Sequence, residues 1–107
     1  MLTLPPPIRS YFSANSDLDV EAMLAPFAAD AVVKDERRTH QGTAAIRAWI
    51  KEASLGNQAI AVPLTIQSDE PLHHVMAQVS GSFPGSPVTL AFHFRLDGGR
   101  IARLEIL

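Results

Sequence analysis

The second half of the chain carries the pattern that most constrains its fold. After Asn57, apolar residues alternate with small or polar ones in four extended runs, and the turn sequences SDEP, PGSP and DGGR separate these runs. Alternation with a period of two indicates strands with one buried face, and short turns between them favour antiparallel neighbours. We therefore expect an antiparallel meander, with Pro63 at an edge or a bulge and Gly81 at a sharp bend.

The first half of the chain has a different period, because its apolar residues recur at helical spacing in three segments. The first helix is expected to follow the prolines at positions 5–7. The second is expected to be capped by Ser16 and ended by Pro26. The third is expected to begin at Gly42 and to close at Gly56, where a glycine suits a helix C-terminus.

Helices followed by a strongly bent antiparallel sheet define an α+β fold. We expect the three helices to pack on one face of the sheet, so that its curvature leaves a cone-shaped apolar pocket. Such a space is the usual place for a small molecule. With 107 residues, the sequence is expected to form one domain over residues 1–107, large enough for a core without disulfides or metals.

Composition and charge exclude several classes of function. The net charge is -2 and no stripe of Arg and Lys with interleaved aromatic residues is present, so no nucleic-acid partner is expected. The absence of cysteine excludes disulfides and thiolate chemistry. No apolar run approaches the roughly 18 residues of a membrane span, and the N-terminus lacks a signal-peptide pattern. We therefore expect a cytoplasmic protein without a membrane partner.

One acidic residue stands out in the short strand predicted for residues 31–36, which precedes a polar loop at 37–41. Asp35 shares a strand face with Val33, whereas Glu36 is expected to point outward. A carboxylate on an inward face is partly desolvated and becomes a better base near neutral pH. Asp35 is therefore a candidate general base. The alternative is that Asp35 ends the strand and accepts hydrogen bonds from the loop or pairs with Arg37 or Arg38.

Two further polar residues are candidates for the same site. Tyr11 lies in the apolar stripe of the first helix, where a tyrosine is either a core residue or a functional hydroxyl donor. His40 follows Asp35 closely enough for the loop to pair them, and otherwise it is a surface residue. The adjacent His73 and His74 point to opposite strand faces, so no metal-ligand spacing remains. We expect no metal and no other cofactor.

The order of elements and several segments resemble the nuclear transport factor 2-like superfamily, and specifically its SnoaL-like and ketosteroid isomerase-like branch. The resemblance covers nearly the whole chain. Its carriers are Tyr11, the segment NSDLDVEAML, the strand FAADAVVKDE, the helix entry HQGTAAIRAWI and the final run DGGRIARLEI. This fold hosts isomerases, cyclases, dehydratases, hydrolases and binding proteins, so the resemblance implies the fold more sharply than the activity.

The resemblance also implies roles for two of the candidates. In the isomerase, a tyrosine on the first helix donates a hydrogen bond to the substrate carbonyl, and an aspartate on the first strand moves the neighbouring proton. Tyr11 and Asp35 match these positions. The acid that completes the oxyanion hole corresponds here to Phe92 or Phe94, and two supporting tyrosines are replaced by apolar residues. Steroid isomerisation itself is therefore not predicted.

Apolar side chains of the strands and of the third helix are expected to line the pocket. The helical spacing of Trp49 indicates a core residue in the first place, and a residue of the pocket wall in the second. The expected lining consists of Val33, Trp49, Val75, Val79, Phe92, Phe94 and Leu104.

Three interpretations of function follow. The first is a small-molecule pocket protein, acting on an apolar carbonyl- or hydroxyl-bearing ligand as an isomerase or lyase type of enzyme. The second is a noncatalytic ligand-binding or dimeric scaffold domain. The third is an interaction protein whose large side chains fill the interior. The outer sheet face lacks dense charge and is expected to form a homodimer; its residues are Met76, Gln78, Thr89, Ala91 and His93.

Overall fold

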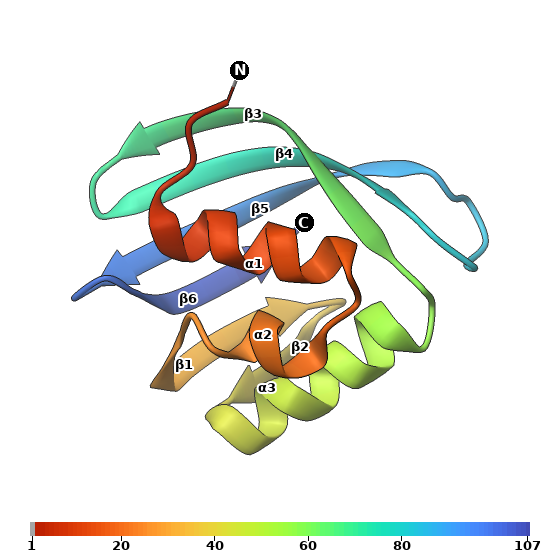
Figure 1. The fold of residues 1–107 in the computed structure, drawn as a ribbon, viewed down its shortest axis with the longest axis horizontal. Coiled ribbons are helices and arrows are strands. Elements are labelled where there is room, and N and C mark those ends of the chain that lie inside the picture. The colour runs from red at the N-terminus through yellow and green to blue at the C-terminus, as the bar shows by residue number, and fades with distance from the viewer. Residues whose placement is uncertain (1) are drawn as a thin grey trace.

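The computed structural model describes residues 2–107, and Figure 1 shows how they are arranged. The helices are α1 (Pro6–Ser16), α2 (Val20–Leu24) and α3 (Thr43–Ile50), which continues into the π-helix η1 (Lys51–Leu55). The strands are β1 (Phe27–Asp35), β2 (Arg38–Gln41), β3 (Ile60–Asp69), β4 (Leu72–Ser80), β5 (Val88–Asp97) and β6 (Arg100–Ile106). The chain thus has an α+β fold.

The six strands form one sheet in the order β2-β1-β6-β5-β4-β3. Neighbouring strands are antiparallel except β1 and β6, which run parallel. The prediction of a purely antiparallel sheet is therefore wrong at this pair. Alternation along a strand indicates which face is buried, but not which distant strand lies beside it. The sheet is not closed, because β2 and β3 form its opposite edges, and the helices lie in front of it in Figure 1.

Strand β2 occupies residues that the sequence predicted as a loop. Asp35 pairs with Arg38, so β1 and β2 form a hairpin whose turn consists of Glu36 and Arg37. Both turn residues have positive φ, 52° and 65°. A two-residue type I′ hairpin turn requires this backbone, and it usually contains Asn-Gly. Because Glu-Arg is not such a pair, the sequence carried no signal for the turn.

Strands β3 to β6 form the predicted meander. β3 is an edge strand, and its register with β4 shifts between Pro63 and Thr65, so the expected edge and bulge are both confirmed. Gly81 lies just after β4 rather than within the strand. A Cβ at Gly81 would lie 2.6 Å from the carbonyl oxygen of Asn57. This glycine therefore allows the β4–β5 loop to pack closely against the segment that follows η1.

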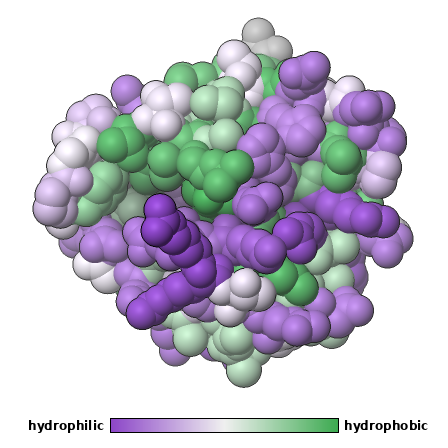
Figure 2. Space-filling model, turned by 180° about the vertical axis from the view of Figure 1, so that it is seen from behind, coloured by the Kyte–Doolittle hydropathy of each residue, from purple (hydrophilic) through white to green (hydrophobic). Residues whose placement is uncertain are grey.

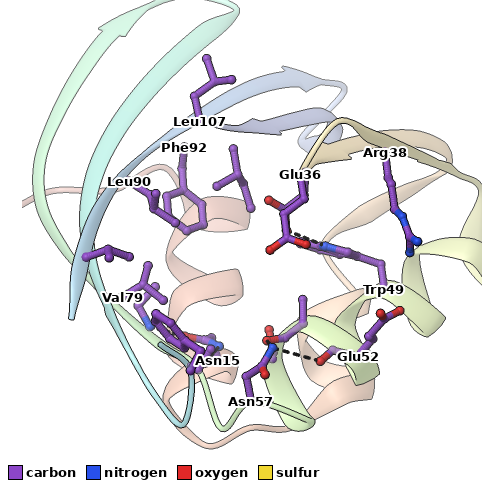
Figure 3. A pocket seen from close by; sticks show the side chains of 18 of the residues that line it. Asn15, Glu36, Arg38, Trp49, Glu52, Asn57, Val79, Leu90, Phe92 and Leu107 are labelled. Atoms are coloured by element: carbon purple, nitrogen blue, oxygen red, sulfur yellow. Dashed lines mark hydrogen bonds between the residues drawn. The ribbon is translucent and has the colours of Figure 1, made fainter. Parts of the chain in front are cut away.

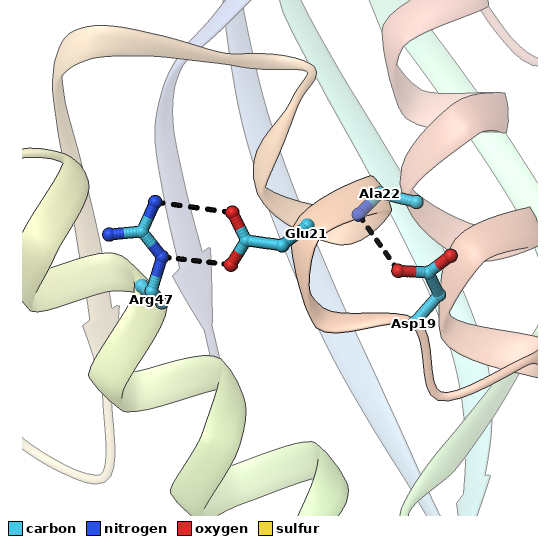
Figure 4. A network of polar contacts seen from close by, with 4 residues as sticks. All are labelled: Asp19, Glu21, Ala22 and Arg47. Carbon is cyan, nitrogen blue, oxygen red and sulfur yellow. Dashed lines mark hydrogen bonds and ion pairs between the residues drawn. The ribbon is translucent and has the colours of Figure 1, made fainter.

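Helix α2 is held at its start and against α3 (Figure 4). Asp19, rather than the predicted Ser16, caps the helix, and its Oδ1 accepts the N–H of Ala22 at 3.2 Å. Ser16 cannot cap α2 because it is the last residue of α1. Glu21 forms a two-bond ion pair with Arg47 of α3, with N–O distances of 2.8 and 3.2 Å. The pair orients two short helices at the surface, where ion pairs contribute little to stability.

The third helical segment ends in a π-helix. The N–H of Gly56 bonds to the carbonyl of Lys51, five residues back, at 2.9 Å. Gly56 closes the segment as expected, but its φ of -62° is right-handed. Close packing selects this glycine instead, since a Cβ would lie 2.8 Å from the carbonyl oxygen of Glu52. π-Helical turns are frequent at functional sites, and this one carries Ala53 and Ser54 to the cavity described below.

Aromatic rings fix α1 on the sheet. Tyr11 contacts Phe27 and Phe94 edge to face, with ring centroids 5.8 and 5.9 Å apart. Phe12 contacts Phe92 in the same way at 5.4 Å. Aromatic pairs favour this geometry, and each pair adds to the free energy of ordinary burial. The cluster therefore determines where the Tyr11 side chain lies.

Asn15 fixes the other end of α1 to the start of β3. Its Nδ2 donates to the carbonyl of Ala59 at 2.9 Å, and its Oδ1 accepts the N–H of Ala61 at 2.7 Å. The side chain is only 3% exposed. A buried amide that satisfies two backbone groups has a structural role, although Asn15 also contributes to the cavity wall.

Candidate functional site

A cavity of about 790 Å³ lies between the sheet and the helical segments, beside Asp35. The interior next to this acid is therefore open, and the interpretation of an interaction protein with a filled interior is not supported. Residues from α1, the β1–β2 hairpin, α3 with η1, and strands β3 to β6 all contribute to the wall.

Two sides of the cavity differ in chemistry. The apolar side comes from β4, β5 and the end of the chain, and it includes Val79, Leu90, Phe92 and Leu107. The polar side comes from the β1–β2 hairpin and η1, and it includes Asp35, Glu36, Arg38 and Glu52. On the face shown in Figure 2, a hydrophobic patch likewise borders strongly hydrophilic side chains. A ligand with an apolar body and a polar end would match these walls.

Asp35 ends β1 and lines the cavity in a half-buried position. Its Oδ2 accepts a hydrogen bond from Nε1 of Trp49 at 3.0 Å, drawn as a dashed line in Figure 3. Within residues 2–107, neither Arg37 nor Arg38 forms an ion pair with it. The alternative that Asp35 pairs with a loop arginine is therefore wrong. The indole holds one carboxylate oxygen, and the other is free to contact a ligand.

Tyr11 lines the same cavity from α1 and is 3% exposed. Its hydroxyl has no hydrogen-bond partner in the described part of the chain. Burial raises the pKa of Tyr11 above its ordinary value of 10.0, and the negative charge of Asp35 raises it further. The hydroxyl therefore stays protonated near neutral pH and can donate a hydrogen bond. The two residues that the sequence paired thus face one cavity.

His40 also lines the cavity, from β2 rather than from a loop. Its ring lies against Trp49, with centroids 6.2 Å apart and planes tilted by 32°. Within residues 2–107, His40 forms no hydrogen bond with Asp35, which accepts one from Trp49 instead. The register of the hairpin explains this, because His40 lies opposite Val33 and Asp35 lies opposite Arg38.

The apolar lining agrees only partly with the prediction. The predicted residues that line the cavity are Trp49, Val79 and Phe92. The predicted residues that do not line it are Val33, Val75, Phe94 and Leu104, each at most 1% exposed. These four side chains are buried in the core instead, and Phe94, for example, lies against Tyr11 and Phe12 of α1. The aromatic contacts between α1 and Phe94 show why alternation alone could not separate core from cavity.

Several lining residues were not predicted. Glu36 was expected on the outer face, but its positive φ breaks the alternation of β1 and directs its side chain toward the cavity (Figure 3). Phe83 and Pro84 line the cavity from the β4–β5 loop. Leu107, after β6, completes this side.

The remaining histidines do not form a metal centre. No group of three or more His, Cys, Asp or Glu residues within 2–107 could hold a metal ion. Nδ1 of His73 contacts the hydroxyl of Ser68 at 2.8 Å in the core, whereas His74 and His93 face each other across β4 and β5.

No helix among residues 2–107 is long and apolar enough to cross a membrane.

A sheet covered on one face by helices, with a cavity beside an acid on its first strand, defines a class of small α+β proteins. The model of the SnoaL-like domain family matches residues 8–104. The chain therefore belongs to the SnoaL-like domain family, in the superfamily that the sequence resembles. A comparison with curated proteins gave no match.

Solved structures with the same fold include one with high sequence identity. A candidate polyketide cyclase from Sinorhizobium meliloti is 47% identical, with 97% of this chain and 95% of that chain covered and a TM-score of 0.93. The epoxide hydrolase/cyclase-like enzyme SalBIII, with a role in pyran ring formation in salinomycin, is 17% identical. That comparison covers 95% of this chain and 87% of that chain at a TM-score of 0.84, and it shows the fold alone.

Proposed function

We propose that this protein binds a small apolar molecule and carries out cofactor-independent acid–base chemistry of the isomerase, lyase or cyclase type. The supporting observation is that Asp35 and Tyr11 line one cavity, with the Tyr11 hydroxyl lacking a partner within residues 2–107. A base beside a hydrogen-bond donor suits a carbonyl- or hydroxyl-bearing ligand. The 47% identity to a candidate polyketide cyclase favours the cyclase form of this chemistry.

In the proposed reaction, the free oxygen of Asp35 takes a proton from a carbon next to a carbonyl group. The electron pair of the broken C–H bond moves toward the carbonyl oxygen, and the hydroxyl of Tyr11 stabilises the developing negative charge. Trp49 keeps the Asp35 carboxylate in place through its indole N–H. Return of the proton at another atom gives isomerisation. Attack of the carbanion on a second carbonyl carbon gives cyclisation, and the resulting alkoxide oxygen takes the proton back from Asp35.

Phe92 sets a limit on this chemistry. It lines the cavity from β5, in one of the two positions at which the isomerase resemblance predicts an acidic oxyanion donor. Loss of one oxyanion donor typically lowers the rate by about 10²- to 10³-fold. We therefore expect substrates whose C–H group is already acidic, such as a carbon between two carbonyl groups.

Deuterium exchange into 2-tetralone, an apolar ketone with an activated CH₂ group, tests the proposal by proton NMR. Asp35→Asn should slow the enzyme-dependent exchange by roughly 10²-fold or more while the protein stays folded. Asp30→Asn is the matched control, because Asp30 lies exposed on the same strand and outside the cavity. Equal exchange rates for the wild-type protein and Asp35→Asn would rule out Asp35 as the base.

A noncatalytic binding role is the second candidate, favoured by the phenylalanine at the position of the oxyanion donor. In that case Asp35→Asn would bind small apolar ligands as tightly as the wild-type protein, and no ketone would exchange.

A homodimer through the outer sheet face is proposed for either role. Large apolar side chains are exposed there, with Val62 at 53% and Met76 at 39%. Light scattering would test this, because Met76→Glu should convert a dimer to a monomer.

A further inference from the structure

The hairpin turn at the cavity holds Glu36 in a backbone conformation that L-residues avoid. Its φ is 52°, and Arg37 beside it has a φ of 65°. Left-handed backbone at a residue other than glycine, asparagine or aspartate costs stability, and such strain often marks functional positions. The hairpin would form at lower cost with Asn-Gly. The glutamate is therefore not explained by the turn alone.

Strain at Glu36 has a direct effect on the cavity. In a regular strand Glu36 would face away from Asp35, because successive side chains alternate. The left-handed backbone places both residues on the cavity wall instead, and Figure 3 shows the Glu36 side chain pointing toward the open space. Neither carboxylate forms an ion pair within residues 2–107. The polar side of the cavity thus carries Asp35 and Glu36 without an ion-pair partner in the described chain, together with Glu52 and the two arginines Arg37 and Arg38.

A second observation indicates that a ligand reaches this end. Tyr11 is 97% buried, lines the cavity, and its hydroxyl has no partner in the described chain. The negative charge of Asp35 raises the pKa of Tyr11 further than burial alone, and both residues line the cavity. Two arginines also line the wall, but Arg38 lies beyond Trp49 as seen from the cavity in Figure 3. Glu36 is therefore a more direct neighbour of a bound molecule than Arg38.

We propose that Glu36 determines ligand specificity, by selecting molecules whose polar end carries a positive charge or hydrogen-bond donors. Ionised carboxylates only accept hydrogen bonds, so an ammonium or amino group at this end is favoured and a carboxylate is disfavoured. The apolar wall opposite holds the body of the ligand. This inference rests on the proposed function, because it assumes that the cavity binds small molecules.

Three probes with one apolar body test the proposal: 4-phenylbutylamine, 4-phenylbutanol and 4-phenylbutanoate. Trp49 is the single tryptophan of the chain and lines the cavity, so its fluorescence reports binding. We expect the protonated amine to bind about 5- to 10-fold more tightly than the alcohol, and the carboxylate most weakly. Glu36→Gln should reduce the preference for the amine to within about twofold and leave the Kd of the alcohol unchanged. Glu105→Gln has the same charge change on the outer sheet face and should keep the preference.

The outcomes separate this inference from the function on which it rests. If none of the three probes binds, both the small-molecule cavity and the role of Glu36 are overturned. If the alcohol binds but the amine has no advantage, or if Glu36→Gln keeps that advantage, only the role of Glu36 is overturned. The role of Glu36 is also overturned if the carboxylate binds most tightly, because that result would indicate that the arginines determine specificity.

A stability measurement provides an independent readout. Glu36→Gly should raise Tm by about 4 °C, because glycine adopts positive φ without strain, and it should abolish the preference for the amine. Gln58→Gly is the matched control, since Gln58 is exposed, has a φ of 48° and does not line the cavity. It should keep the preference and gain somewhat less stability, because Gln58 Oε1 accepts a hydrogen bond from the Ser82 hydroxyl at 3.4 Å. If Glu36→Gly gains stability and keeps the preference, Glu36 is only a turn residue.

Discussion

The indole N–H of Trp49 donates a hydrogen bond to Oδ2 of Asp35 across 3.0 Å. This contact joins α3 to the end of β1 and orients the acid of the candidate site. Hydrogen bonds to charged groups contribute about 1.5–3 kcal/mol. Because Asp35 is half-buried, we expect a coupling energy near the lower limit between Trp49→Phe and Asp35→Ala. Urea unfolding followed by circular dichroism would measure this cycle, and strictly additive losses of stability would contradict the bond.

The Tyr11 hydroxyl should resist ionisation. Tyr11 is the only tyrosine of the chain, so the absorbance of phenolate at 295 nm reports it alone. Burial and the charge of Asp35 raise its pKa in the folded state above the ordinary value of 10.0. We expect no phenolate signal at pH 10 while the protein is folded, and a midpoint close to 10 would show a solvated hydroxyl.

The same shift has a consequence for stability. A raised folded-state pKa favours the protonated folded form, so the contribution is fully present below pH 10 and is lost as the pH rises above the unfolded value. Wild-type stability should therefore fall more steeply above pH 10 than that of Tyr11→Phe. Parallel curves from urea unfolding at several pH values would contradict this expectation.

Asn15→Ala should be strongly destabilising. It would leave the carbonyl of Ala59 and the N–H of Ala61 without their partner. Each unsatisfied buried group costs about 1–3 kcal/mol, so we expect a loss of roughly 2–4 kcal/mol in urea unfolding. Ser13→Ala, at an exposed position of the same helix, should change stability by less than about 0.5 kcal/mol. A similar small change for Asn15→Ala would show that water replaces the amide.

Gly81→Ala should destabilise through contact rather than through backbone strain. The added Cβ would lie 2.6 Å from the Asn57 carbonyl oxygen, so the β4–β5 loop would have to move. Gly85 offers the opposite case, because its φ is 86° but nothing lies within 4 Å of an added Cβ. We expect Gly85→Ala to cost about 1 kcal/mol and Gly81→Ala clearly more. Thermal unfolding of the two variants would test this order.

Turn residues and prolines made much of the fold predictable from the sequence. Turn residues separate the last four strands, and Pro63 indicated both the edge and the bulge of β3. The parallel pairing of β1 with β6 could not be predicted, since it joins segments far apart in the chain. The strand at 38–41 also left no signal, because its residues are polar and its turn lacks Asn-Gly.

The candidate site was predictable to the extent that strand and helix periodicity determined it. Tyr11 and Asp35 were placed together by their positions, and both line the cavity. The place of Glu36 in the cavity wall was not predictable. A positive φ at a glutamate has no sequence signature, and it reverses the direction of the side chain. Phe94 was assigned to the cavity although α1 covers it, and which part of a sheet face a helix covers is a tertiary property.

The central position of β6 in the sheet affects the order in which the strands can pair during folding. β6 follows the other five strands in the sequence, yet within residues 2–107 it is the strand that lies between β1 and β5 and joins the β1–β2 hairpin to strands β3 to β5. During synthesis, the β1–β2 hairpin and strands β3 to β5 must therefore keep unpaired edges until residues 100–106 emerge from the ribosome. The pairing of Phe27 with Ile101 then closes a long loop, and such distant contacts slow folding. The two parts of the sheet, the β1–β2 hairpin and strands β3 to β5, should therefore join in a late step, when β6 pairs with both β1 and β5.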